Sequence, residues 1–288
     1  MLAPGGRTGR LYLVDPSSRS VESVEGFSAN SAYKGGHAFG ATSADEAEGQ
    51  VLVLDRAAMT LGLADPATGR VVASTAVASA PDYVRYVAPR HEAWVTEPDD
   101  QRIEVFAVSA DTAAPSLTHA AFIFVEDGPE SLAVDLPRKR AYTNLRHRMT
   151  MAIDINSHEV AGRWPNGCRD ARGIALDAKA GFVFTACAEG KVVALDATRD
   201  GRMLSIADVS AGADRLAFSS TLRRLYVPGA PDGTLTALDV AADGKLLPVW
   251  TAGVPDESHC AAADDRGGVW VCDPARGRLL LFLDTKKP

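Results

Sequence analysis

Short apolar runs alternate with polar turns along the whole chain. The runs are rich in Val, Leu, Ile and aromatic residues and are bounded by Gly, Pro, Asp and Asn, which is typical of strands joined by turns. Residues 81–108 show the pattern clearly, with apolar runs at 84–86, 93–96 and 103–108. No stretch sustains the period of about 3.6 residues expected of a helix, so little helix is predicted.

The same group of strands returns along the chain. One residue precedes the first apolar run of each group, at intervals of about 44 residues. These residues are His37, Tyr83, Ser131, Gly173, Arg215 and His259. About four antiparallel strands in a unit of this length is typical of a propeller blade. Radial packing of blades buries both faces of each sheet and leaves only short edges exposed.

The number of first strands favours a propeller of six four-stranded blades over one of seven. The segment 11–24 reads as a third and a fourth strand, and the C-terminal group supplies its own first three strands. We therefore expect N- and C-terminal strands to share one blade, which would tie the two ends together. Residues 1–288 are predicted to form a single propeller domain, with 1–9 as a flexible N-terminal extension.

Two phrases, LGLADPATGRVVASTAVASAPDYV at 61–84 and RRLYVPGAPDGTLTALD at 223–239, resemble the YVTN-type β-propeller repeat family. The resemblance extends from Gly9 to Asp284 and departs from the family pattern at 36–50 and at 146–150. It implies the propeller fold. It implies no single activity, because propellers host many unrelated functions.

Composition and charge narrow the choice of partners. The net charge of −7 and the pI near 5.4 argue against a nucleic-acid surface, which needs clustered Lys and Arg. The basic stretch 138–148 is interpreted as solvated turn charge. No apolar run is long enough to span a bilayer, so membrane insertion is not expected. The start of the chain lacks the apolar core of a signal peptide. We expect a monomer.

Candidate binding residues lie just before the first strands, because these strands line the central channel of a propeller. The predicted ring of polar side chains at the channel mouth comprises His37, Asp82, Tyr83, Glu130, Ser131, Arg172, Asp214, Arg215 and His259. Ligands commonly bind at such concave places. The first hypothesis is that the chain is a non-catalytic binding module that holds a small molecule or a protein segment at the channel mouth. The alternative is that these side chains bind no ligand, are solvated, and pair their charges with one another.

A second hypothesis is a hydrolase or lyase acting at the same mouth. If six blades close, His37 and His259 become neighbours and, with a carboxylate, can hold a divalent metal ion such as Zn²⁺. In this hypothesis His37 and His259 are metal ligands or acid/base groups and Glu130 is the base. Arg172 or Arg215 would clamp an anionic group. Six-bladed lactonases bind their metal through acidic and Asn side chains. This chain resembles them only at Glu130 and Asn144.

The four cysteines suggest two disulfides. Cys260 and Cys272 lie on facing strands of one hairpin, and Cys168 and Cys187 lie at the same end of another. Two such pairs favour a periplasmic or secreted location, with the cytoplasm as the alternative. The cysteines can also be four buried thiols, and Cys260 can contribute with the adjacent His259 to a mixed Cys/His site. The remaining turn histidines are expected to be exposed: His91, His147 and His158.

Overall fold

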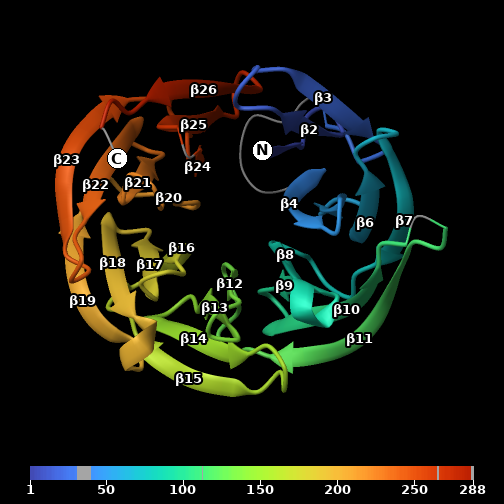
Figure 1. Cartoon of the computed structure of the whole chain (residues 1–288), viewed down its shortest axis with the longest axis horizontal. Coiled ribbons are helices and arrows are strands. Elements are labelled where there is room, and N and C mark those ends of the chain that lie inside the picture. The colour runs from blue at the N-terminus through green and yellow to red at the C-terminus, as the bar shows by residue number, and fades with distance from the viewer. Residues whose placement is uncertain (31–39, 112, 265, 287–288) are drawn as a thin grey trace. The chain divides into compact units, whose positions relative to one another are not determined.

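The computed structural model describes residues 1–30, 40–111, 113–264 and 266–286. The chain is all-β, and its antiparallel sheets are the blades of a β-propeller (Figure 1). The chain divides into two compact units, one of Met1–Val134 with Ile155–Glu159 and one of Asp135–Asp154 with Val160–Pro288. In the part of the chain that the structure describes, helix is limited to the 3-10 turns Ala88–Arg90 and Ala197–Arg199.

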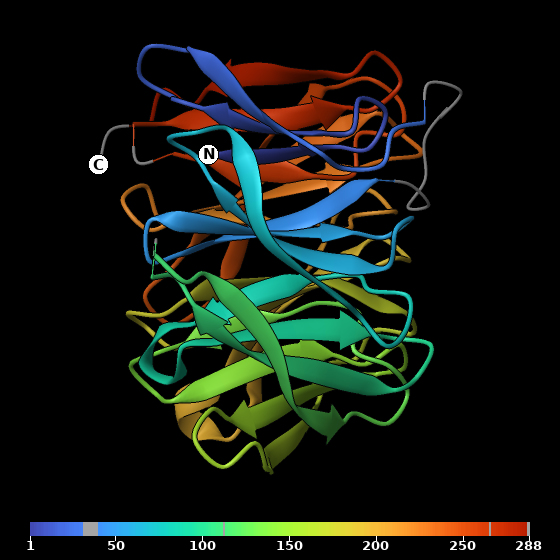
Figure 2. The ribbon, with the colours of Figure 1, turned by 90° about the vertical axis from the view of Figure 1, so that its right-hand side faces the viewer.

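The first unit contains one sheet of three strands and two of four, each formed by strands consecutive in the chain. The strands are β1 (Leu2–Gly5), β2 (Arg10–Val14), β3 (Val21–Glu25), β4 (Ala41–Ala47), β5 (Gln50–Asp55), β6 (Thr60–Asp65), β7 (Arg70–Ala76), β8 (Val84–Val87), β9 (Glu92–Glu97), β10 (Arg102–Ser109) and β11 (Ser116–Phe124). Figure 2 shows the cyan β7 and the green β11 running across the outside of their sheets.

Apart from Ala133 and Val134, the first two residues of its first strand, which belong to the first unit, the second unit contains three further sheets of four strands and a C-terminal sheet of three. Its strands are β12 (Ala133–Asp135), β13 (Arg140–Asn144), β14 (Met149–Asp154), β15 (Val160–Pro165), β16 (Ala171–Asp177), β17 (Phe182–Cys187), β18 (Lys191–Asp196), β19 (Arg202–Asp208), β20 (Ala217–Ser219), β21 (Arg224–Gly229), β22 (Thr234–Val240), β23 (Leu246–Gly253), β24 (Ala261–Ala263), β25 (Gly268–Asp273) and β26 (Arg278–Leu283). Within this unit the first strands β16, β20 and β24 lie side by side (Figure 1).

The predictions of six blades and of a shared terminal blade are wrong. The described residues form seven sheets, and β1, β2 and β3 make a sheet of their own. β1 pairs with β2 in the register Leu2↔Leu13 and Pro4↔Leu11, so β1 occupies the edge of β2 that was expected to pair with a C-terminal strand. Because β1 contains Pro4 and Gly5, it does not read as a strand in the sequence. Proline is tolerated there because β1 is an edge strand.

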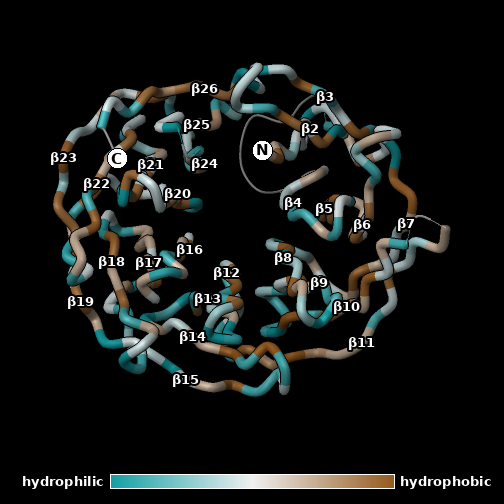
Figure 3. Tube along the Cα trace, viewed as in Figure 1, coloured by the Kyte–Doolittle hydropathy of each residue, from teal (hydrophilic) through white to brown (hydrophobic). Residues whose placement is uncertain are grey.

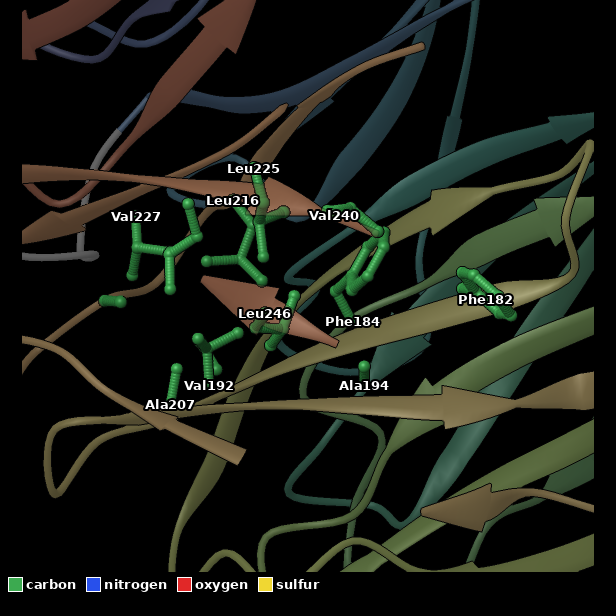
Figure 4. Packing of buried hydrophobic residues seen from close by; sticks show 13 residues of the cluster. Phe182, Phe184, Val192, Ala194, Ala207, Leu216, Leu225, Val227, Val240 and Leu246 are labelled. Atoms are coloured by element: carbon green, nitrogen blue, oxygen red, sulfur yellow. The ribbon is translucent and has the colours of Figure 1, made fainter. Parts of the chain in front are cut away.

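The core lies between neighbouring sheets. One cluster packs side chains of β17 and β18, including Phe184, against side chains of β21 and β22, including Leu225 (Figure 4). Figure 3 shows hydrophobic and hydrophilic positions interspersed along the strands. Burying a side chain such as Phe184 stabilises the fold by about 1.5–3 kcal/mol. This packing explains why the strands β5, β9, β17 and β21 are buried along their whole length.

An ion-pair network holds the end of the C-terminal sheet. The carboxylate of Asp284, which follows β26, accepts hydrogen bonds from Arg224 Nη1 at 2.7 Å and from the Tyr226 hydroxyl at 2.9 Å. The side chains of Asp284 and Arg224 are 2 % and 5 % exposed. Arg224 also pairs with Asp239 of β22, which in turn contacts Lys286. The chain after β26 is therefore tied to the preceding sheet by buried charge as well as by packing.

Candidate functional site

The predicted mouth residues of the first unit differ in exposure. Tyr83 is buried, and its backbone N–H donates to the Thr96 hydroxyl at 2.9 Å. The guanidinium of Arg85 lies over the Tyr83 ring, 5.6 Å from its centroid. Asp82 is partly exposed and pairs with Arg56 at 3.5 Å, a partner that the sequence pattern did not indicate. Tyr83 therefore contributes mainly to packing, and Asp82 remains within reach of solvent.

Glu130 and Ser131 are also buried, at 6 % and 1 % exposure. They precede β12 and are enclosed by protein. The role of Glu130 as a base stays a prediction.

In the second unit, the predicted residues of three successive first strands are brought together. The backbone N–H groups of Asp214 and Arg215 both donate to the carbonyl oxygen of His259, at 3.2 and 3.0 Å. A Cβ atom on Gly173, beside Arg172, would lie 2.3 Å from the Asp214 carbonyl oxygen. This close approach of two backbones requires glycine. We call Arg172, Asp214, Arg215 and His259 the rim residues.

Buried Asn144 holds one end of this arrangement. Its Nδ2 donates to the carbonyl oxygens of Arg172 and Gly173, at 2.9 and 3.0 Å. Its Oδ1 accepts from the hydroxyls of Thr150 and Thr185, at 2.8 and 3.0 Å. These bonds use both ends of an amide that is fully buried, so the geometry gives Asn144 a structural role in positioning the rim rather than that of a metal ligand.

The rim carries charge of both signs. Arg172 forms an ion pair with Asp170 at 2.9 Å, and the two side chains are 40 % and 41 % exposed. The neighbouring turn 146–148 lies against the rim, because the Ala171 N–H donates to the Arg146 carbonyl oxygen at 3.2 Å. Charge-assisted bonds from a guanidinium to a carboxylate are among the stronger polar contacts available to a ligand. The partly exposed guanidinium of Arg172 can therefore exchange Asp170 for a ligand carboxylate.

Glu189 organises the loop that leads into the rim. Its carboxylate accepts from the backbone N–H groups of Arg169 and Asp170, at 2.7 and 3.4 Å. Burial alone would raise the pKa of Glu189, but these backbone N–H groups and the charge of Arg169 outweigh it and lower the pKa. The carboxylate is thus held ionised as an acceptor for the loop.

A buried carboxyl pair in the first unit was not predicted. Glu97 accepts from the Ser79 N–H and Glu104 from the Ala78 N–H, both at 2.9 Å. Burial raises the pKa of Glu97 and the neighbouring Glu104 adds to the rise, whereas Arg102 opposes it. The pair fixes the linker between β7 and β8 to the sheet. In the sequence each glutamate stands among the apolar residues of a strand. The local alternation therefore predicts that its side chain faces solvent.

The turn histidines have different environments. His91 and His147 are exposed, as predicted. The prediction is wrong for His158, whose side chain is 20 % exposed. Its Nε2 lies 2.9 Å from the carboxylate of buried Glu92, and its ring meets the Trp94 ring edge-on at 5.3 Å. These partners are distant in sequence, so no local signal could have identified them.

Both predicted cysteine pairs lie at disulfide distance. Cys168 and Cys187 have Cα atoms 5.1 Å apart, and Cys260 and Cys272 have Cα atoms 5.6 Å apart. The first pair is fully buried, whereas the second is partly exposed.

The metal prediction rested on His37 and His259. His37 lies outside the described residues, so this pair stays a prediction. Among the described residues, one group of three His, Cys, Asp or Glu side chains has ligand atoms close enough for a metal ion: His259, Cys260 and Cys272.

In sequence, no family model and no curated protein matches the chain. In fold, the hydrazine synthase of Kuenenia stuttgartiensis is similar with a TM-score of 0.77 and 12% identity, covering 97% of this chain and 90% of that one. A chain of the mitotic checkpoint complex gives a TM-score of 0.78 at 12% identity, covering 99% and 84%. The Cps50 (Swd1) β-propeller domain of Myceliophteria thermophila gives 0.77 at 10% identity, covering 99% and 94%. At these identities the likeness shows the fold alone.

None of the helical turns in the described residues has the length and hydropathy of a membrane-crossing helix.

Proposed function

We propose that this chain is a non-catalytic binding module that holds carboxylate groups of a peptide segment or small molecule on the rim residues. The observation that carries the proposal is the direct backbone contact that brings Arg215 and His259 together and places Gly173, next to Arg172, against Asp214. Two guanidinium groups on neighbouring first strands offer paired donors to an anionic group.

The propeller fold supports a binding role, because such folds commonly serve as scaffolds for other molecules. One similar structure belongs to the mitotic checkpoint complex, a protein assembly. The net charge of −7 speaks against nucleic acid as the partner. The hydrolase or lyase alternative uses His37 together with His259 and Glu130, and His37 lies outside the described residues.

The two cysteine pairs support an oxidising compartment, and we propose a periplasmic or secreted location. We also propose that the chain is a monomeric propeller of the YVTN type, on the strength of the phrases at 61–84 and 223–239.

Fluorescence anisotropy with labelled hexaglutamate and hexalysine peptides tests the binding proposal. We expect hexaglutamate to bind and hexalysine not to bind. Arg172→Ala or Arg215→Ala should weaken hexaglutamate binding by about tenfold or more, which corresponds to about 1.4 kcal/mol per lost charged contact. The matched control is Arg199→Ala, an exposed arginine in the turn between β18 and β19, at the other end of its sheet. Equal binding of both peptides, or equal losses in the rim and control variants, would overturn the proposal.

A further inference from the structure

We propose that Cys260, Cys272 and His259 form a redox-gated site for a thiophilic metal ion such as Zn²⁺. This inference goes beyond the proposed binding function and does not depend on it. The ligand atoms of the three side chains lie within 4.8 Å of one another. Two thiolates and one imidazole are a ligand set that suits Zn²⁺, and three protein ligands leave a fourth tetrahedral position for water or an added ligand.

The strand pairing places the two cysteines correctly. β24 and β25 pair in the register Ala261↔Val271, so Cys260 and Cys272 are the next facing positions. The Cys272 N–H donates to the Cys260 carbonyl oxygen at 3.2 Å, which fixes the backbones relative to each other. Zn–S bonds of about 2.3 Å in tetrahedral geometry place two sulfurs about 3.8 Å apart. Rotation of two facing side chains with Cα atoms 5.6 Å apart can reach that separation without moving the strands.

The environment of His259 supports a ligand role. Its Nδ1 lies 2.7 Å from the carbonyl oxygen of Glu257. A carbonyl oxygen only accepts, so Nδ1 carries the hydrogen and Nε2 is left as the nitrogen with a lone pair. Metal-binding histidines usually have this arrangement, in which the second ring nitrogen donates to a backbone carbonyl and fixes the tautomer.

Accessibility distinguishes this pair from the other cysteine pair. Cys260 and Cys272 are partly exposed, whereas Cys168 and Cys187 are 0 % exposed. A reductant and a metal ion can therefore reach the C-terminal pair while the protein stays folded. The buried pair belongs to no group of metal-ligating side chains in the described part of the chain.

Reduction of the Cys260–Cys272 disulfide, a two-electron step, opens the site to a metal ion. A dithiol reductant transfers two electrons and two protons to the Cys260–Cys272 disulfide, breaks the Sγ–Sγ bond and becomes a cyclic disulfide itself. Metal binding then displaces the two thiol protons, because thiolates are the ligands. A disulfide oxidant reverses the step: it takes two electrons from the Cys260 and Cys272 thiolates and two protons from water, becomes two thiols, and the Sγ–Sγ bond re-forms as the ion is released. The oxidised protein thus holds no metal here, and the reduced protein holds one.

Co²⁺ binding tests the proposal, since thiolate-bound Co²⁺ has intense charge-transfer absorption. Tag-free protein is treated with dithiothreitol under native conditions, freed of reductant without oxygen, and titrated with Co²⁺. Alkylation and peptide mass spectrometry show which cysteines are reduced. We expect free thiols at 260 and 272, one Co²⁺ per chain with thiolate absorption, and displacement of Co²⁺ by Zn²⁺. The oxidised protein should show no such absorption.

Variants separate the ligands from structural effects. Cys272→Ser should abolish the thiolate absorption, and His259→Ala should weaken Co²⁺ binding by about tenfold or more. The control His147→Ala changes an exposed histidine of the same unit and should leave binding unchanged. His259→Ala still permits the disulfide, so thiol counting shows that its fold is retained. The proposal fails if protein reduced at 260 and 272 binds no Co²⁺, or if His259→Ala binds it as tightly as the parent.

Discussion

The two cysteine pairs occupy contrasting places in the second unit. Cys168 and Cys187 join the start of β16 to the end of β17 in a four-stranded sheet, and both are fully buried in a cluster with Tyr142 and Trp164. Cys260 and Cys272 join β24 and β25 in the three-stranded C-terminal sheet, are partly exposed, and lie beside a histidine.

Loop length does not separate the two pairs. Their sequence separations are 19 and 12 residues. On the chain-entropy model each cross-link would contribute about 3 kcal/mol. The two cysteine pairs therefore differ in their burial and in the other contacts that stabilise each sheet. One bond sits in a packed core, and the other sits where solvent and ions have access. The same covalent link is therefore enclosed by packing in one sheet and open to solvent in the other.

The largest effect is expected from removing the buried pair. Cys168→Ala with Cys187→Ala should lower the free energy of unfolding by about 4 kcal/mol, because lost core packing adds to the lost cross-link. Urea denaturation monitored by tryptophan fluorescence measures it. If this variant lost no more free energy of unfolding than the corresponding variant of the C-terminal pair, the two disulfides would not differ in their structural role.

The next effect concerns the ion-pair network that holds the C-terminal sheet. Asp284→Asn should cost about 3 kcal/mol at neutral pH, since it leaves the buried charge of Arg224 with one partner fewer. Thermal and urea unfolding measure the loss. A loss below about 1 kcal/mol would mean that the packing of β25, not the ion pair, anchors this sheet.

The same carboxylate gives a pH dependence. Burial would raise the pKa of Asp284, but the Lys286 N–H, the Tyr226 hydroxyl and Arg224 together lower it below the usual value of 3.8. A lowered pKa means stability that is present above 3.8 and lost as the pH falls through the lower folded-state pKa. The stability difference between the parent and Asp284→Asn should therefore shrink below that pH. A difference independent of pH would exclude the charge as its source.

The smallest effect is expected from the exposed pair. Cys260→Ala with Cys272→Ala should cost about 2 kcal/mol or less, because the Asp284 network still holds the end of β26 and a small terminal sheet opens locally with less cost. Urea denaturation beside the buried-pair variant gives the comparison directly. A cost equal to that of the buried pair would assign the C-terminal disulfide a structural role as well.

Much of the fold follows from local pattern. The apolar runs 93–96 and 103–108 became strands β9 and β10, because alternation and turn residues act between neighbours in the chain. Both cysteine pairs were predictable for the same reason, since each lies within one hairpin or one sheet. β1 was missed because its Pro4 and Gly5 argue against a strand, and pairing with β2 overrides that preference.

The candidate site was only partly predictable. The alignment of first strands identified Arg172, Arg215 and His259, which the structure brings together. It could not show that Glu130 and Tyr83 are buried, or that Asn144 is committed to backbone carbonyls. Burial and side-chain partners depend on neighbouring sheets that are remote in sequence.

Local sequence pattern predicted most of the strands, the repeating unit and the two cysteine pairs, because each depends on residues close together in the chain. Tertiary structure decided the number of blades, the buried place of one disulfide and the accessible place of the other next to His259. The physical reason is that strand pairing within a hairpin is local. Which edge is occupied and which side chain is covered depend on contacts between segments that only the folded chain brings together.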